Sequence, residues 1–197
     1  MKGGTPSRRA LAARARRLRL LLLDVDGVLT DGDITYTEGG EESKRFHIHD
    51  GMGIDLLARA GIRSGILTGR RSAMVERRAR ELGMTIIKQG FYDKHAGLVE
   101  ILGQEGLGGA EVAYVGDDVQ DLSVMRAVGF RAAPANAVAE VKAEADYVCR
   151  SAGGFGAVRE VADLLLTLLG KKKAAVAEAS RPGVTPPPGR AAASKAR

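Results

Sequence analysis

The sequence has no tryptophan, few other aromatic residues and a single cysteine, Cys149. One cysteine cannot form an internal disulfide or supply a thiolate cluster for zinc, so a disulfide-stabilised fold and a cysteine-rich metal site are excluded. This cysteine usage is typical of a reducing compartment. We expect Cys149 to be a buried core residue.

Long hydrophobic runs are also missing. The longest apolar run near the N-terminus is far shorter than a membrane span, and no small-residue cleavage site follows an apolar core. We therefore expect a soluble, cytoplasmic protein without a membrane partner. With 197 residues and 45% hydrophobic content, the chain is long enough to bury a core as one domain.

The net charge of +6 is distributed unevenly. Residues 1–19 and 170–197 together carry +13, which leaves −7 for the body between them. A nucleic-acid-binding domain concentrates positive charge on one folded face, so we expect solvated basic ends and no specific nucleic-acid partner. The alternative, binding through the ends, predicts affinity that falls steeply with salt and disappears when residues 171–197 are deleted.

The apolar and polar pattern predicts an α/β fold. Residues 18–25 are too uniformly apolar for a half-exposed strand, which favours the buried centre of a parallel sheet. Two alternating segments around Gly39-Gly40 predict a β-hairpin at about residues 33–48, with its second strand over 43–48. Beyond it, strands and helices alternate, which is typical of a doubly wound, Rossmann-like parallel sheet with helices on both faces. The other expected strands are 63–67, 85–87, 112–115, 130–132 and 147–149, and the expected helices are 8–17, 50–60, 72–82, 93–105, 121–128, 138–143 and 157–169, with Asp50, Ser72 and Asp93 as caps.

The ends of the chain differ in composition from this region. Residues 1–7 are expected to be flexible, and residues 8–169 to form one domain. From residue 170 onward Ala, Pro, Gly, Ser and Lys dominate, including Pro186-Pro187-Pro188. Such a segment has little with which to build a core, so we predict a disordered basic tail over 170–197.

Polar residues follow four of the predicted strands, and in a doubly wound sheet these strand ends share one edge, where ligands bind. Each short motif alone is common, but their order after successive strands indicates one site. The residues are Asp24 and Asp26 after the first strand, Thr68, Gly69 and Arg70 after the second, Lys94 after the third, and Asp117, Asp118 and Asp121 after the fourth.

Each of these residue types has a role in phosphate chemistry. Carboxylates at positions i and i+2 of an extended segment project to the same side, so Asp24 and Asp26 are expected to face one substrate. Clustered carboxylates repel one another unless a cation lies between them, and Mg²⁺ with oxygen ligands relieves this repulsion best. Thr68 and Gly69 offer a hydroxyl and a backbone N–H to phosphate oxygens, and Lys94 adds a positive charge.

A phosphatase mechanism follows as a hypothesis. Asp24 attacks phosphorus and forms an aspartyl phosphate, while Asp26 protonates the leaving oxygen and later activates water. The metal, Thr68 and Lys94 stabilise the equatorial phosphoryl oxygens.

These motifs resemble the four motifs of the haloacid dehalogenase superfamily of phosphatases. The matching segments are residues 24–32, 67–70, 93–94 and 116–121. The resemblance covers residues 8–169. It implies Mg²⁺ bound by Asp24, by the backbone carbonyl of Asp26 and by Asp117, with Asp118 and Asp121 beside these ligands.

The chain has no room for the cap domain that such enzymes usually carry, because the hairpin and a helix fill the interval from Asp26 to Thr68. An uncapped site is open to water, so another element must enclose the substrate. In the branch that the chain resembles most, the 3-deoxy-D-manno-octulosonate 8-phosphate phosphatases, hairpins assemble a homotetramer in which neighbouring subunits close each site.

Further segments resemble that branch, namely residues 30–32, 46–54, 89–94 and 153–160. The resemblance implies a role in lipopolysaccharide biosynthesis and an acidic sugar phosphate whose carboxylate Arg side chains grip. His47 and His49 depart from it, because family members often have Asn and Arg there, as does Asp55, where a basic residue is common. The implied substrate contacts are His47, Ile48, His49, Asp50, Gly51, Gly69, Arg70, Arg78 and Lys94.

Alternatives remain for individual residues and for the function. The two histidines could lie on the polar face of the hairpin, and Arg78, beside Arg71, Arg77 and Arg80, could belong to a solvated helix face. A phosphatase of another acidic sugar phosphate, such as a nine-carbon one, would share all these motifs. A receiver-like phosphoacceptor module also uses clustered Asp, Thr and Lys, but multiple turnover of p-nitrophenyl phosphate with Mg²⁺ would exclude it.

Overall fold

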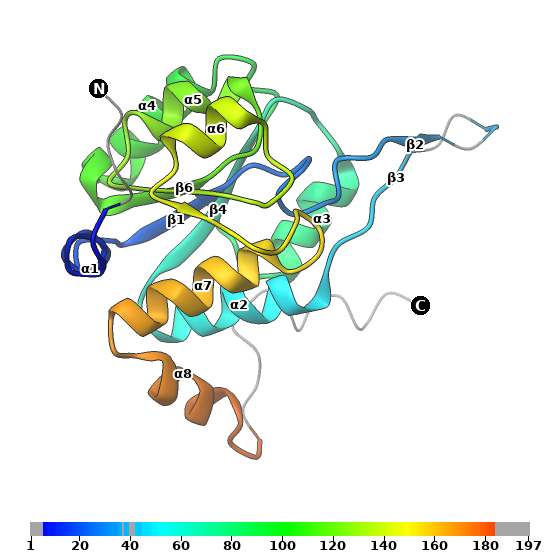
Figure 1. Ribbon diagram of the computed structural model, residues 1–197. Helices are drawn as coiled ribbons and strands as arrows, with labels where there is room; N and C mark the ends of the chain where they lie inside the picture. Colours follow the sequence, from blue (N-terminus) through cyan, green and yellow to red (C-terminus); the bar gives the residue numbers. More distant parts are fainter. Residues whose placement is uncertain (1–5, 37, 40–41, 184–197) are drawn as a thin grey trace.

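A six-stranded parallel sheet forms the centre of the computed structural model, which describes residues 6–36, 38–39 and 42–183 (Figure 1). The strand order is β5-β4-β1-β6-β7-β8, and every pairing is parallel. The predicted α/β fold is therefore confirmed, with the first strand at the centre of the sheet. The strands are β1 (Leu20–Leu23), β4 (Arg63–Thr68), β5 (Ile86–Gln89), β6 (Val112–Val115), β7 (Phe130–Ala133) and β8 (Tyr147–Val148).

Helices cover both faces of the sheet, because alternate residues of the central strand face opposite sides. Leu21 and Leu23 belong to one hydrophobic cluster, and Leu20 and Leu22 belong to another. None of the helices in the described ranges combines the length and the apolar character that crossing a bilayer requires. The first face carries α1 (Arg8–Ala15), α2 (Ile48–Arg59), α3 (Ala73–Glu81) and α7 (Ala157–Leu168), and the second carries α4 (Lys94–Glu105), α5 (Leu122–Met125) and α6 (Ala139–Glu144) (Figure 1).

The predicted hairpin projects from the body of the molecule (Figure 1). It consists of β2 (Thr35–Tyr36) and β3 (Glu42–Ser43), which pair antiparallel, and residues 37, 40 and 41 of its turn lie outside the described part. The prediction of a second strand over 43–48 is wrong beyond Ser43. Past that residue the chain has no strand partner among the described residues and returns to the body, where α2 begins at Ile48.

The prediction that Asp50 caps this helix is also wrong. The N-cap position is His47, which makes no side-chain cap hydrogen bond. Asp50 lies inside the first turn, 1% exposed, and its Oδ1 accepts a hydrogen bond of 2.8 Å from the backbone N–H of Arg159 in α7. The Asp50 carboxylate therefore makes a tertiary contact with α7 instead of capping the N-terminus of α2. Asp93 does cap α4, because its side chain accepts a hydrogen bond from the backbone N–H of Ala96.

A helix after residue 170 corrects the prediction of a wholly disordered tail. Residues Lys172–Ala179 form α8, which packs beside α2 (Figure 1). Ala175 is 3% exposed, Lys171 Nζ donates to the carbonyl of Ala60 at 2.7 Å, and Glu178 pairs with Arg59 at 3.3 Å. The rest of the predicted tail, 184–197, lies outside the described residues, as do residues 1–5 of the predicted flexible N-terminus.

Candidate active site

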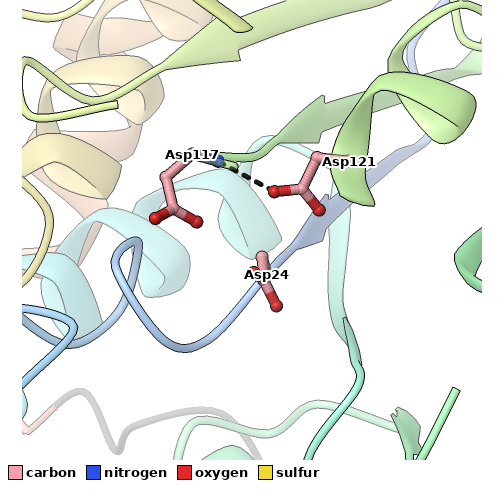
Figure 2. A group of neighbouring side chains, drawn as sticks. All are labelled: Asp24, Asp117 and Asp121. Atoms are coloured by element: carbon pink, nitrogen blue, oxygen red, sulfur yellow. Dashed lines mark hydrogen bonds between the residues drawn. The ribbon is translucent and has the colours of Figure 1, made fainter. Parts of the chain in front are cut away.

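Three carboxylates meet at the carboxyl ends of β1 and β6 (Figure 2). Asp24 follows β1 directly, and its backbone N–H donates to the carbonyl of Val115 in β6. Asp117 and Asp121 come from the loop and 3₁₀ turn (Val119–Asp121) that follow β6. One ligand oxygen from each of the three lies within 4.8 Å of the others, so the predicted convergence of these strand ends is confirmed.

Asp121 is the structural member of this group. It is fully buried, and its Oδ1 accepts hydrogen bonds from Lys94 Nζ and Tyr114 Oη, both at 2.6 Å. Its Oδ2 accepts from the backbone N–H groups of Asp117 at 2.9 Å and Asp118 at 3.2 Å. Both oxygens are thus in use, and Asp121 fixes the lysine and the loop rather than offering a free ligand atom. Sequence reasoning did not find Tyr114, because a tyrosine inside an apolar strand is indistinguishable from a core residue.

The other two acids keep free oxygen atoms. Asp24 Oδ1 and Asp117 Oδ1 are buried and accept no hydrogen bond. Burial and then the charge of Asp121 raise the pKa of Asp24 to about 6, although Lys94 opposes this. Burial, followed by the charges of Asp24 and Asp121, raises the pKa of Asp117 to about 8. Two buried carboxylates that repel each other and lack donors fit a divalent cation with oxygen ligands, as Mg²⁺ requires.

A close backbone approach shapes the loop that holds Asp24. Gly27 has φ +88°, and a Cβ there would lie 2.0 Å from Asp117 Oδ2. A Cβ on Gly153 would lie 1.7 Å from the carbonyl oxygen of Gly27, and Gly154 N donates to the carbonyl of Val28. Only glycine leaves room for this contact. The segment after β8 therefore presses directly on the loop after β1.

Lys94 stands where the sequence placed it, beside the acids. It is the first residue of α4, 4% exposed, and its Nζ lies 2.9 Å from Asp24 Oδ2 and 2.6 Å from Asp121 Oδ1. Burial alone would lower the pKa of Lys94, but the two carboxylates raise it above its usual value. Thr68 ends β4 and is 3% exposed, and Gly69 follows it, where a Cβ would lie 3.6 Å from Gln120 Oε1.

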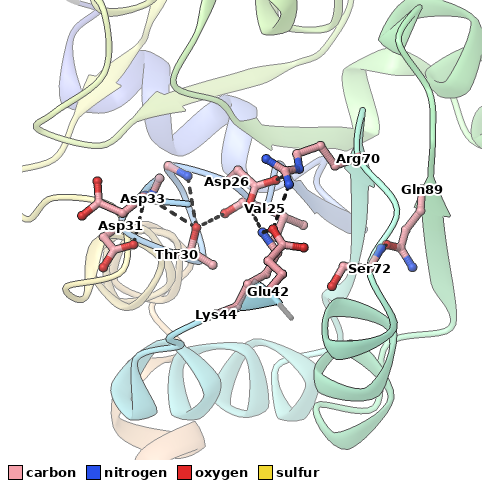
Figure 3. A network of polar contacts seen from close by, with 12 residues as sticks. Val25, Asp26, Thr30, Asp31, Asp33, Glu42, Lys44, Arg70, Ser72 and Gln89 are labelled. Carbon is pink, nitrogen blue, oxygen red and sulfur yellow. Dashed lines mark hydrogen bonds and ion pairs between the residues drawn. The ribbon is translucent and has the colours of Figure 1, made fainter. Parts of the chain in front are cut away.

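The Asp26 carboxylate lies outside the group of three acids and contacts the hairpin instead (Figure 3). Lys44 Nζ lies 2.5 Å from Asp26 Oδ1 and 3.3 Å from Glu42 Oε1. Arg70 Nη2 donates to Glu42 Oε1 at 2.8 Å, and Arg70 Nε lies 4.0 Å from Asp26 Oδ2. Sequence reasoning missed Lys44 and Glu42, because both lie in a charged run that resembles any solvated turn.

A groove of about 590 Å³ opens beside this ion-pair network. It is lined by Gly69 and Arg70 together with Tyr36 of the hairpin and Tyr92 before α4, both of which are exposed. Two of the predicted substrate-binding residues thus share an opening. The two tyrosines were not predicted, since an isolated aromatic residue gives no signal in a single sequence.

His47 and His49 line a different groove, of about 490 Å³, formed with Phe155 and α7. Their rings meet edge to face with centroids 5.0 Å apart. Ile48 between them is 63% exposed. The structure of the single chain therefore does not bring these three residues into the groove beside Arg70.

The remaining predicted substrate contacts, Asp50, Gly51 and Arg78, are packed against other parts of the chain. Asp50 and Gly51 are buried in α2. Arg78 lies 3.4 Å from Glu81, and a Cβ on Gly51 would meet its guanidinium at 2.8 Å. Asp118 is exposed and caps the 3₁₀ turn by accepting from the N–H of Val119. These four residues hold the scaffold in this structure.

The sequence is similar to those of known phosphatases. Residues 86–161 match the family model described as haloacid dehalogenase-like hydrolase. A curated relative, the 3-deoxy-D-manno-octulosonate 8-phosphate phosphatase of Escherichia coli K12, is 46% identical over 159 residues, which span 81% of this chain and 85% of the relative.

Solved structures are similar over most of the chain. The chain superposes on the 3-deoxy-D-manno-octulosonate 8-phosphate phosphatase of Yersinia pestis with a TM-score of 0.81 and 43% identity, covering 83% of this chain and 89% of that one. For the phosphatase of the same name from Moraxella catarrhalis, solved with magnesium, phosphate and KDO, the TM-score is 0.82 and the identity 41%, covering 85% and 96%.

Proposed function

Because the chain belongs to the haloacid dehalogenase-like hydrolases, and within them to the 3-deoxy-D-manno-octulosonate 8-phosphate phosphatase family, we propose that it hydrolyses this eight-carbon acidic sugar phosphate. The products are 3-deoxy-D-manno-octulosonate and phosphate. The observation that carries the proposal is the buried Asp24, which has one oxygen on Lys94 and the other without a donor.

The free oxygen makes Asp24 the nucleophile. Its Oδ1 attacks phosphorus, the bond from phosphorus to the sugar oxygen breaks, and the carboxyl group of Asp26 gives its proton to that oxygen. Water then loses a proton to Asp26 and attacks the phosphorus of the aspartyl phosphate, which releases phosphate and restores Asp24. Lys94 and Thr68 stabilise charge on the phosphoryl oxygens, since Lys94 lies 2.9 Å from Asp24 and Thr68 ends the strand that pairs with β1.

The carboxylates of Asp24 and Asp117 would hold Mg²⁺, together with the backbone carbonyl of Asp26. When bound, the cation neutralises the carboxylates and the phosphate that approaches them. Asp121 would not be a ligand of the cation. Its carboxylate already accepts hydrogen bonds from Lys94 Nζ and from the backbone N–H of Asp117.

Replacing Asp24 tests the mechanism. Asp24→Asn removes the nucleophile but keeps the size of the side chain, so phosphate release should fall below about 10⁻³ of the parent rate while the far-ultraviolet circular dichroism stays the same. A matched control is Asp33→Asn, which changes an exposed aspartate outside the site. Parental turnover by Asp24→Asn would contradict the assignment.

Substrate selection is proposed to depend on the groove beside Arg70. The Arg70 side chain is 37% exposed, so it is available to bind the carboxylate of an acidic sugar. The test is a phosphate-release screen across eight-carbon, nine-carbon and neutral sugar phosphates. Preference for the eight-carbon acidic sugar supports the proposal, preference for a nine-carbon one favours the related phosphatase, and equal rates on all would contradict both.

We also propose that the chain assembles as a tetramer through its hairpins, which would enclose sites that are open in the single chain. Support comes from the projecting hairpin and from Ile34 and Tyr36, which are 50% and 64% exposed. A patch of this kind on an outlying element is typical of an interface. Light scattering on the purified protein should give four times the chain mass, and Tyr36→Glu should lower it.

A further inference from the structure

The hairpin delivers a buried lysine to the end of the central strand (Figure 3). Lys44 comes directly after β3, and its side chain is only 1% exposed, compared with 37% for Arg70. A lysine enclosed to this degree cannot reach a substrate in solution. Its ammonium group therefore acts on protein atoms, and those atoms belong to Asp26 and Glu42.

The position of this ammonium group is specific. A lysine side chain is flexible and strongly hydrated, so it stays buried only where anions replace its water. Here two carboxylates do so, with Lys44 Nζ 2.5 Å from Asp26 Oδ1 and 3.3 Å from Glu42 Oε1. Removing these carboxylates would leave the Lys44 ammonium group buried and unpaired. The contact thus fixes the Asp26 side chain in one orientation.

The contact also distinguishes the two oxygens of Asp26. Oδ1 is occupied by Lys44, whereas Oδ2 faces Arg70, at 4.0 Å from its Nε. Arg70 is held in turn by Glu42 at 2.8 Å. Carboxylates and cations therefore alternate in this network. Asp26 Oδ2 is the oxygen that faces Arg70, the exposed cation. Proton exchange with a ligand that Arg70 binds is therefore confined to Oδ2.

We propose that Lys44 is a positioning residue, which holds Asp26 so that Oδ2 meets the leaving oxygen of the substrate. The inference rests on the proposed phosphatase function and adds a residue to it. In the step concerned, Asp26 reacts as the carboxylic acid, with its proton on Oδ2 and with Oδ1 accepting from Lys44. The bond from Asp24 to phosphorus forms, the bond between phosphorus and the sugar oxygen breaks, the Oδ2–H bond breaks, and the sugar oxygen gains that proton. Lys44 itself exchanges no proton.

Leaving-group dependence tests this role. An alkoxide leaves poorly unless it is protonated, whereas p-nitrophenolate leaves without help. Lys44→Met should therefore lower kcat on the eight-carbon sugar phosphate by about 10²-fold, the low end for a lost general acid, but lower kcat on p-nitrophenyl phosphate by about threefold or less. KM should stay within about threefold of the parent on both substrates, since uniform binding is untouched. Lys44→Arg, which keeps the charge, should recover most of the sugar phosphate activity.

A double variant separates positioning from a merely structural role. If Lys44 acts through Asp26, adding Lys44→Met to Asp26→Asn should cause no further loss in kcat, because coupled residues are not additive. Lys88→Met is the matched control, since Lys88 pairs with Glu100 away from the network and should leave both activities unchanged. Equal loss on the two substrates, or additive loss in the double variant, would overturn the proposal.

Failure of the inference can be distinguished from failure of the proposed function. If the parent chain turns over neither substrate, the phosphatase assignment fails before Lys44 is tested. If Lys44→Met does not fold, the test uses Lys44→Arg instead. Its kcat is compared with that of the parent, and the kcat of Asp26→Asn/Lys44→Arg is compared with that of Asp26→Asn. A larger loss for Lys44→Arg on p-nitrophenyl phosphate than on the sugar phosphate would then contradict it.

Discussion

The three carboxylates of the site differ in how many of their oxygen atoms already accept hydrogen bonds. Both oxygens of Asp121 are occupied, whereas Asp24 and Asp117 each have one buried oxygen without a donor. Sequence reasoning found all three, because each follows a strand end. It could not assign their roles, since these depend on donors such as Tyr114, which arrive from elsewhere in the chain.

This difference predicts opposite effects of the same substitution. Asp121→Asn removes one of the two charged partners of the buried Lys94 and weakens the hydrogen bonds that hold the loop, so it should lower the free energy of unfolding by about 3 to 5 kcal/mol. Asp117→Asn removes a repelled charge and should leave the metal-free protein equally or more stable, but raise the Mg²⁺ concentration for half-maximal activity by more than about tenfold. Urea titrations and Mg²⁺ titrations of the two variants check this. The same stability loss in both would contradict it.

The Glu160 carboxyl group is expected to make the stability of the fold depend on pH. Burial alone would raise its pKa, but hydrogen bonds from Tyr147 Oη and the backbone N–H groups of Arg150 and Ser151 lower it to about 2. A lowered carboxyl pKa stabilises the fold above the unfolded pKa of about 4.3, and this stability is lost as pH falls toward 2.

Between pH 5 and pH 3 the loss attributable to Glu160 should be about 2 kcal/mol. Glu160→Gln cannot titrate, so its unfolding free energy should fall less steeply over that interval. Urea unfolding of parent and variant at both pH values measures the difference. Parallel pH dependences of the two proteins would show that the hydrogen bonds to Glu160 do not act in this way.

At the scale of elements, alternation of strands and helices was sufficient to predict the sheet, and β6 lies at the predicted residues 112–115. The predictions were wrong where tertiary contacts determine the local structure. The second hairpin strand stops at Ser43 because β2 is too short to pair further, and Asp50 serves α7 instead of its own helix. A lysine- and alanine-rich segment is compatible with both a helix and a tail, and only packing on α2 makes α8 a helix.

The packing of α8 has a direct test. Ala175 is buried and Ala177, two residues further along the same helix, is exposed. Ala175→Asp should therefore lower the free energy of unfolding by about 1 to 3 kcal/mol, the cost of placing a polar group in an apolar contact. Ala177→Asp should change it by about 0.5 kcal/mol or less. Thermal unfolding followed by circular dichroism compares them, and equal midpoints would show that α8 does not dock.

At the scale of the whole molecule, the parallel sheet collects like charges at one edge, and the fold tolerates them only when they are compensated. A cation that binds the folded state alone adds stability by mass action. With Mg²⁺ at 100 times its Kd, the gain is about 2.7 kcal/mol. For a domain of this length this corresponds to a rise in Tm of about 5 to 10 °C.

Scanning calorimetry with Mg²⁺ and with a chelator tests this expectation. The parent protein should show the rise, and Asp117→Asn should lose most of it, because the negative charge of this ligand is gone. Lys88→Met serves as the control that keeps it. A Tm independent of Mg²⁺ in the parent would contradict a cation at this edge.

The contact between Gly153 and the carbonyl of Gly27 has a consequence for synthesis of the chain. Asp24 emerges from the ribosome early, yet its loop is fixed by Gly153 and Gly154, which follow the last strand. The strand before it, β1, also pairs with β6, which is synthesised later. A nascent chain therefore exposes its reactive carboxylate long before the surroundings that make it reactive exist. Phosphatase activity therefore requires that the segment after β8 has been synthesised.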